Sequence, residues 1–248
     1  MIRLIALKEL RSLFHAPSTW YILGGMQLVL GWLFLALISQ FMSEQTQLAL
    51  NPYLKGATEE IVPWFFREIV SPLLMVVTPI FAMRLMTDER RNQTLALLLS
   101  APVSSAGIVL GKFAGLLTFL WLVILFVAAM NLTLNIGTEM DIGLLLSNVA
   151  GLLLLAAANG SLALYISSLT AQPLAAAIAA EAALLGPWLI ERNAFDRYRF
   201  WQDIAPSGHF HHFNSGLLDS GDAIYYLVFT VFFLTLAIRR LDNTRIYG

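Results

Sequence analysis

Long apolar stretches, separated by short polar segments, make up most of the chain. The hydrocarbon core of a bilayer is about 30 Å thick, and a helix needs about 20 apolar residues to cross it. Six stretches meet this length: residues 18–42, 67–86, 107–134, 144–168, 172–190 and 222–238. Pro63, Pro72 and Pro79 lie at or inside the second stretch and predict a kinked helix, because each removes a backbone donor. The pattern predicts an all-α membrane protein with six transmembrane helices.

The basic residues divide unevenly between the two sides of these predicted spans. If the N-terminus lies inside, the inner segments carry ten of the 15 Lys and Arg residues, and most acidic residues fall outside. The positive-inside rule then places both termini and the charged segment after the second span in the cytoplasm. Residues 1–11 form an amphipathic lead-in without a small-residue cleavage site, so we expect this segment to be retained.

Composition narrows the class of protein further. The chain of 248 residues is 58% hydrophobic and 12% charged, with a mean hydropathy of +0.72, whereas soluble domains carry about 25% charged residues. This excludes a soluble domain and leaves membrane lipid as its surroundings. The absence of cysteine excludes disulfides, thiolate catalysis and Cys-ligated metals. A net charge of −1 gives no indication of nucleic-acid binding.

The segment between the second and third spans combines charges with leucines. Four charged residues, Asp88 to Arg91, precede Leu95, Leu98 and Leu99, which have the i, i+3, i+4 spacing of one helix face. Ionised side chains cost at least a few kcal/mol each in hydrocarbon, yet the leucines need an apolar cover. A short surface helix that docks on a soluble partner meets both demands. The alternative is an ordinary cytoplasmic loop with an interfacial helix.

A longer ordered pattern surrounds these residues. It comprises Glu89, Arg90, Asn92, Thr94, Leu95, Leu97, Leu98, Leu99, Ser100, Ala101, Pro102, Val103, Ser104, Gly111 and Lys112. This order resembles the cytoplasmic coupling segment of type-2 ABC-transporter permeases. The resemblance implies a coupling helix between spans 2 and 3 that contacts a cytoplasmic ABC ATPase subunit. The predicted interface consists of Asp88, Glu89, Arg90, Arg91, Thr94, Leu95, Leu98, Leu99 and Pro102.

The run Gly107 to Phe113 is not a phosphate loop. Its glycine spacing is one residue short, and Phe113 stands where a metal-binding hydroxyl is required. We therefore expect this chain to bind no cofactor and to be no enzyme itself, with ATP and Mg²⁺ bound by the partner ATPase. Neither a Ser/His/Asp set nor an H-E-x-x-H motif is present. Asn148, Asn159, Ser161, Ser167 and Ser168, in or near the fourth span, predict hydrogen bonds between helices.

The polar segment of about residues 191–221 mixes aromatic residues with charges, as expected at a membrane boundary. It predicts re-entrant or interfacial helices on the outer side, between spans 5 and 6. A second ordered motif here resembles the GldF/NosY-like branch of type-2 ABC permeases. Its residues are Pro206, Phe210, Phe213, Gly216, Asp219, Asp222, Tyr225 and Tyr226.

Three histidines, His209, His211 and His212, lie inside this second motif. Imidazole suits zinc and copper, so one reading is a metal site. The other reading is that they form hydrogen bonds at a membrane surface. We predict no metal from the sequence, because spacing alone does not bring three or four ligands together. The nearest carboxylates, Asp203 and Asp219, are within reach only if the loop folds back.

Glu181 is the carboxylate well inside a predicted span, among many alanines. An ionisable residue in lipid is by default functional and faces a cavity or a partner helix, while small residues permit close helix approach. Two readings stay open: Glu181 lines a substrate pathway, or it packs at a helix or dimer interface.

The sequence thus predicts a single type-2 ABC permease domain over residues 1–248. The resemblance implies a multi-pass protein of the bacterial inner membrane that couples ATP hydrolysis by its partner to export or to conformational work. A second permease copy completes the pathway, most simply as a homodimer, and a periplasmic partner is a further expectation. The alternatives are a proton-coupled secondary transporter that uses Glu181 and a non-transporting membrane anchor of an envelope complex.

Overall fold

The fold is helical throughout the part of the chain that the computed structural model describes, residues 2–48, 56–92, 103–136, 140–193 and 205–247. The helices are α1 (Ile2–His15), α2 (Pro17–Leu48), α3 (Ala57–Trp64), η1 (Phe65–Val70), α4 (Ser71–Arg91), α6 (Ser105–Leu132), η2 (Thr133–Ile136), α7 (Ile142–Leu169), α8 (Pro173–Asn193), α10 (Pro206–Asn214) and α11 (Ser220–Tyr247). Within these described ranges, six helical stretches are long and apolar enough to cross a membrane. The all-α class with six spans is confirmed.

The second span differs most from its predicted bounds. It runs from Thr58 to Arg91, so it begins nine residues before position 67. Its prolines do not end it, because a π-helical turn, η1, joins α3 to α4. The Ser71 N–H donates to the Phe66 carbonyl, five residues earlier, immediately before Pro72, which has no N–H to donate. The wider turn lets the helix continue through a proline-rich stretch.

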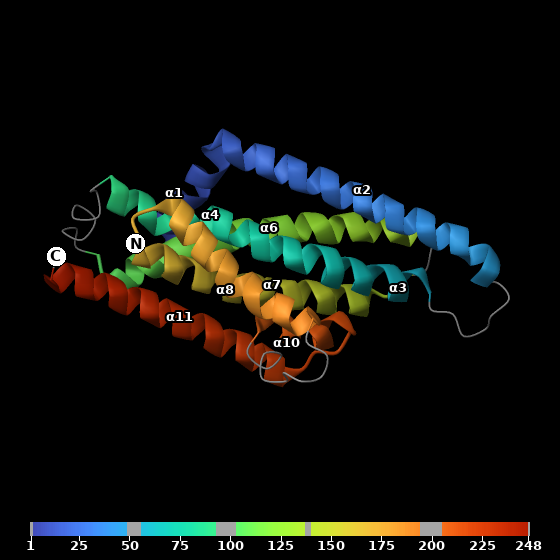
Figure 1. The fold of residues 1–248 in the computed structure, drawn as a ribbon. Helices are drawn as coiled ribbons and strands as arrows, with labels where there is room; N and C mark the ends of the chain where they lie inside the picture. Colours follow the sequence, from blue (N-terminus) through green and yellow to red (C-terminus); the bar gives the residue numbers. More distant parts are fainter. Residues whose placement is uncertain (1, 49–55, 93–102, 137–139, 194–204, 248) are drawn as a thin grey trace.

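The spans form one elongated bundle in which both chain termini lie at the same end (Figure 1). The α4 and α7 spans are the most enclosed, with 61% and 67% of their apolar windows buried, against 17% for α2 and 22% for α8 and α11. The outer helices therefore present their apolar side chains to lipid or to another protein. Such exposure is expected where the surroundings are hydrocarbon.

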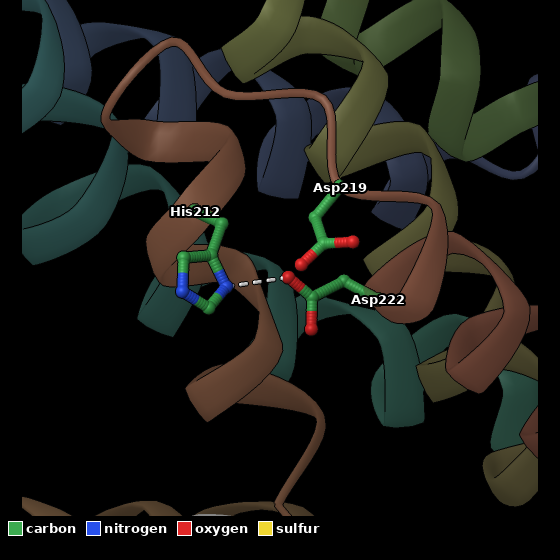
Figure 2. Close-up of side chains that lie close together, drawn as sticks. All are labelled: His212, Asp219 and Asp222. Atoms are coloured by element: carbon green, nitrogen blue, oxygen red, sulfur yellow. Dashed lines mark hydrogen bonds and ion pairs between the residues drawn. The ribbon is translucent and has the colours of Figure 1, made fainter.

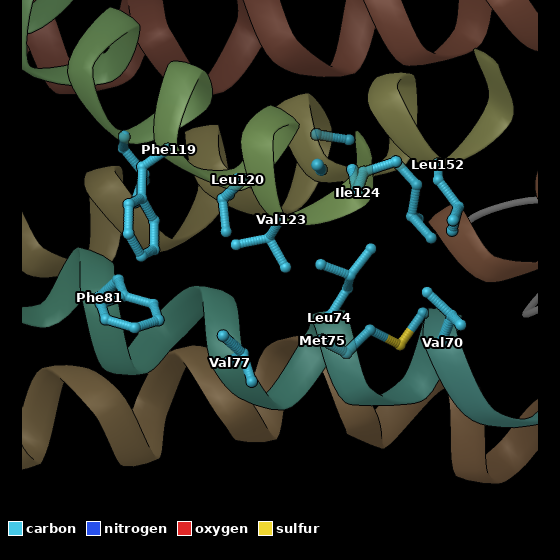
Figure 3. Packing of buried hydrophobic residues seen from close by; sticks show 14 of the residues in the cluster. Val70, Leu74, Met75, Val77, Phe81, Phe119, Leu120, Val123, Ile124 and Leu152 are labelled. Atoms are coloured by element: carbon cyan, nitrogen blue, oxygen red, sulfur yellow. The ribbon is translucent and has the colours of Figure 1, made fainter. Parts of the chain in front are cut away.

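The core lies between α4, α6 and α7 (Figure 3). The rings of Phe81 and Phe119 meet edge to face with their centroids 4.6 Å apart. Leu74, Val123 and Leu152 continue this contact toward the other end of the bundle, each at most 5% exposed. Close packing of this kind, rather than a hydrophobic driving force, holds helices together in a membrane.

The predicted hydrogen bonds between α7 and other helices form at only some of its polar residues. The Ser167 hydroxyl donates to the Met83 carbonyl of α4 at 3.0 Å, and the Asn148 amide approaches the Asn214 carbonyl of α10 at 3.4 Å. These contacts join helices. The hydroxyls of Ser161 and Ser168 instead donate to carbonyls of their own helix, so the prediction for them is wrong. The side chain of Asn159 has no hydrogen-bond partner among the residues that the structure describes.

Candidate functional site

A buried lysine joins three helices at the end of the bundle that carries the termini. The Lys112 side chain, on α6, is 3% exposed, and its Nζ lies 2.8 Å from Glu9 Oε1 of α1 and 2.8 Å from Glu89 Oε1 of α4. Both carboxylates are themselves largely buried, at 13% and 15% exposure. A buried lysine requires such partners, because an uncompensated charge in this environment costs several kcal/mol. We call Glu9, Lys112 and Glu89 the ion triad.

Two glycines of α6 allow α1 to approach closely enough to form the triad. A Cβ on Gly111 would lie 2.7 Å from Ile5 Cβ, and one on Gly115 would lie 2.9 Å from the Ala6 carbonyl oxygen. Because residues four apart share a helix face, Gly111 and Gly115 make a shallow groove that receives α1. Lys112 stands beside this groove and meets Glu9 directly.

The described start of the predicted coupling segment and the residue that follows the segment both contact the end of α11. Arg90, in the first turn of the segment, approaches the Thr244 hydroxyl with its Nη2 at 3.4 Å. Val103, just after it, accepts a hydrogen bond from Arg245 Nη1 at 3.2 Å. Ser104 then begins α6 as its N-cap by accepting from the Gly107 N–H. Residues at the two ends of this segment therefore contact α6 and α11 directly, and Lys112 joins them to α1.

A cavity of about 280 Å³ lies next to the ion triad. Its lining mixes charged side chains, including Lys8, Arg84 and Asp88, with apolar ones from α2 and α4. The cavity is lined by residues of α1, α2, α4 and α6, including all three members of the ion triad.

The structure describes part of the predicted coupling interface. Asp88, Glu89, Arg90 and Arg91 form the last turn of α4, where Glu89 and Arg90 make the contacts above and Arg91 is exposed. Thr94, Leu95, Leu98, Leu99 and Pro102 lie outside the described residues. The interface that these residues would form with an ATPase stays a prediction.

At the other end of the bundle, α10 packs on α7. The rings of Phe210 and Phe213 are buried against Gly151, where an added Cβ would lie 2.6 Å from Phe213 Cβ. Ser147 Oγ also donates to the Phe213 carbonyl at 2.8 Å. The Tyr226 hydroxyl reaches back from α11 to the Pro206 carbonyl at 2.6 Å. A short helix thus occurs within the predicted outer segment, and these four motif residues have packing roles.

Gly216 turns the chain from α10 toward α11. Its φ is +84°, in the left-handed region that favours glycine. The Leu217 N–H donates to the His212 carbonyl and the Gly216 N–H to the Phe213 carbonyl, the paired bonds of a Schellman cap. This turn folds the loop back and brings Asp219 and Asp222 toward the histidines of α10.

Two of the three histidines converge on one carboxylate. Asp222, with a side chain 8% exposed, lies 2.6 Å from His209 Nδ1 through one oxygen and 2.6 Å from His212 Nδ1 through the other. The His209 ring also stacks on Tyr225, with centroids 3.7 Å apart. His211 points elsewhere and lies 3.4 Å from Arg67 Nη1 of η1. Nearby, Arg192 of α8 pairs with Glu68 at 2.6 Å.

Glu181 lies on α8, partly buried, and its Oε2 has no hydrogen-bond partner in the described part of the chain. Buried polar oxygens normally have one. Both readings from the sequence, a pathway residue and an interface residue, remain open.

Sequence reasoning missed two members of the ion triad as site residues. Lys112 was recognised only as the end of an ordered motif, and Glu9 only as part of an amphipathic lead-in. The signal that identifies them is a lysine one position after a glycine at the start of an otherwise apolar span. Such a charge requires a carboxylate partner.

In the described part of the chain, six helices are long and apolar enough to cross a membrane, which defines a multi-pass membrane protein. Residues 3–189 match the family described as ABC-2 family transporter protein. The chain belongs to this family. A comparison with curated proteins found no match. Members of the family are membrane subunits of ABC transporters, which agrees with a chain that is not itself the ATPase.

Proposed function

We propose that this chain is the permease subunit of an ABC transporter and that residues 88–102 receive mechanical work from a separate cytoplasmic ATPase. The single observation that carries the proposal is the family match over residues 3–189, which includes this segment. ATP and Mg²⁺ would bind to the ATPase. The permease would convert closure of the ATPase into export or into conformational work across the inner membrane.

The contacts around the segment support a route for that work. A push on residues 93–102 acts on Glu89 and Arg90 on one side and on Val103 on the other. These residues connect to α1 and α6 through Lys112 and to α11 through Thr244 and Arg245. Packed helices transmit displacement as bodies, because their interiors are dense and resist deformation.

Further parts of the proposal concern assembly and orientation. The excess of basic residues at one side supports cytoplasmic termini. The exposed apolar faces of α2 and α8 support contact with a second permease copy, as a homodimer. The motif from Pro206 to Tyr226 supports assignment to the GldF/NosY-like branch, and the outer helix α10 gives a surface for a periplasmic partner.

The test is co-purification of the ATPase from the native host. Leu98→Asp should abolish recovery of the ATPase with the tagged chain, because a carboxylate cannot fill an apolar groove. Leu217→Asp is the matched control, since this leucine is 62% exposed at the other end of the bundle, and it should leave recovery unchanged. Recovery of no ATPase with the wild-type chain would contradict the proposal.

A second candidate function rests on the unpartnered Oε2 of Glu181, which suits a proton-coupled secondary transporter. Glu181→Gln would then remove the proton dependence of transport. Under the main proposal, transport instead depends on ATP and is lost on Leu98→Asp.

A further inference from the structure

One cluster of potential ligands is not used by the proposed coupling. His212, Asp219 and Asp222 each offer one ligand atom, and these atoms lie within 4.8 Å of one another. Figure 2 shows the Asp219 carboxylate next to the Asp222 oxygen that faces the His212 ring. The residues come from the end of α10, the turn after it and the first turn of α11.

Electrostatics favours a cation at this point. Two carboxylates this close repel each other when both are ionised, and the repulsion grows as water is excluded. A divalent cation between the two carboxylates offsets both negative charges. The Asp222 side chain is also buried, so water screens its negative charge only weakly.

The remaining contacts keep the three ligands oriented. His209 Nδ1 lies 2.6 Å from the second oxygen of Asp222, and its ring stacks on Tyr225. Asp219 accepts the Gly221 N–H through Oδ1 at 2.8 Å. Metal ligands in proteins commonly have such outer contacts, which fix their orientation. The His212 side chain is 56% exposed, so Nε2 can hold the ring proton when Nδ1 binds a metal.

We propose that His212, Asp219 and Asp222 form a divalent transition-metal site, with Zn²⁺ as the best-fitting ion, that joins α10 to the start of α11. One imidazole and two carboxylates suit Zn²⁺, which often takes three protein ligands and a water. His209 is a positioning residue that holds Asp222. The sequence spacing did not bring these groups together; the turn at Gly216 does so.

The test measures binding to the full-length chain, purified in detergent and freed of metal by chelation. Equilibrium dialysis against Zn²⁺ should give one ion per chain, and Co²⁺ in its place should give the visible absorption of a site with protein ligands. Asp219→Asn and His212→Ala should each weaken Zn²⁺ binding by about a hundredfold, and His209→Gln by about tenfold. Zn²⁺ should also raise the thermal unfolding midpoint of the wild-type chain.

His211→Ala is the matched control, because His211 is a neighbour on the same helix whose ring lies near Arg67 instead. It should bind Zn²⁺ as the wild type does. A variant that fails to fold is recognised by a lowered unfolding midpoint measured in chelator. In that case the visible absorption of Co²⁺ bound to the wild-type chain decides whether the metal site exists. The proposal is overturned if the wild type takes up no Zn²⁺ and shows no Co²⁺ absorption, or if His211→Ala weakens binding as strongly as His212→Ala.

Discussion

At the scale of single residues, the buried Lys112 is the residue on which the ion triad depends. Lys112→Met removes the one ammonium that Glu9 and Glu89 share and leaves two largely buried carboxylates close together. Removing one partner of a buried ion pair destabilises a protein by about 3 to 5 kcal/mol. We expect a much lower thermal unfolding midpoint in detergent. Lys8→Met, an exposed lysine one position before Glu9, should leave the midpoint unchanged; equal effects of the two would contradict the role given to the triad.

Gly216 gives a second prediction at this scale. Alanine at φ +84° pays the steric cost of the left-handed region, about 1 to 2 kcal/mol, and its Cβ would lie 3.3 Å from Leu144 Cδ1. Gly216→Ala should lower the unfolding midpoint. Gly186→Ala has open space around the new methyl group and serves as the control. A midpoint unchanged by Gly216→Ala would show that the turn adopts another conformation.

At the scale of helices, the contact between α1 and α6 depends on small residues. Gly115→Ala would place a methyl carbon 2.9 Å from the Ala6 carbonyl oxygen, so α1 must move away. Overpacking of this kind costs about 1 to 3 kcal/mol. We expect a lower unfolding midpoint together with faster proteolysis within α1. Gly24→Ala, at an exposed position of α2 with open space around the new methyl group, should neither lower the midpoint nor speed proteolysis. Rapid cleavage in both variants would argue against the groove.

The sequence was enough to predict that the helices exist, but it did not predict which helices contact one another. The six spans could be predicted because each is a long apolar run, which only a helix can accommodate in a bilayer. The start of the second span was predicted nine residues late, because the helix continues through a proline-containing stretch by way of a π turn. The contact of Glu9 with Lys112, 103 positions apart, depends on how α1 lies on α6.

In the segment from Pro206 to Tyr226, too, the sequence predicted which residues matter but not how they meet. The motif residues from Pro206 to Tyr226 were identified by their order, and the structure gives physical roles to Phe210, Phe213 and Tyr226. Convergence of His212 with Asp219 and Asp222 could not be predicted, because it requires the direction of the turn at Gly216.

At the scale of the whole molecule, α4 and α7 are the most enclosed spans. The residues on either side of 93–102 contact α6 and α11, and Lys112 joins them to α1. A displacement of this segment is therefore expected to move α1, α6 and α11 together. The account requires that the segment lie in the cytoplasm, where the ATPase acts.

Cysteine labelling tests that requirement most directly, since the chain has no cysteine of its own. Thr94→Cys and, as its counterpart, Leu218→Cys, at a leucine 71% exposed at the other end of the bundle, would be treated in intact spheroplasts with a membrane-impermeant maleimide. We predict that Leu218→Cys reacts at once, whereas Thr94→Cys reacts only after permeabilisation and is protected by the ATPase. Reaction of Thr94→Cys in intact spheroplasts would contradict the account.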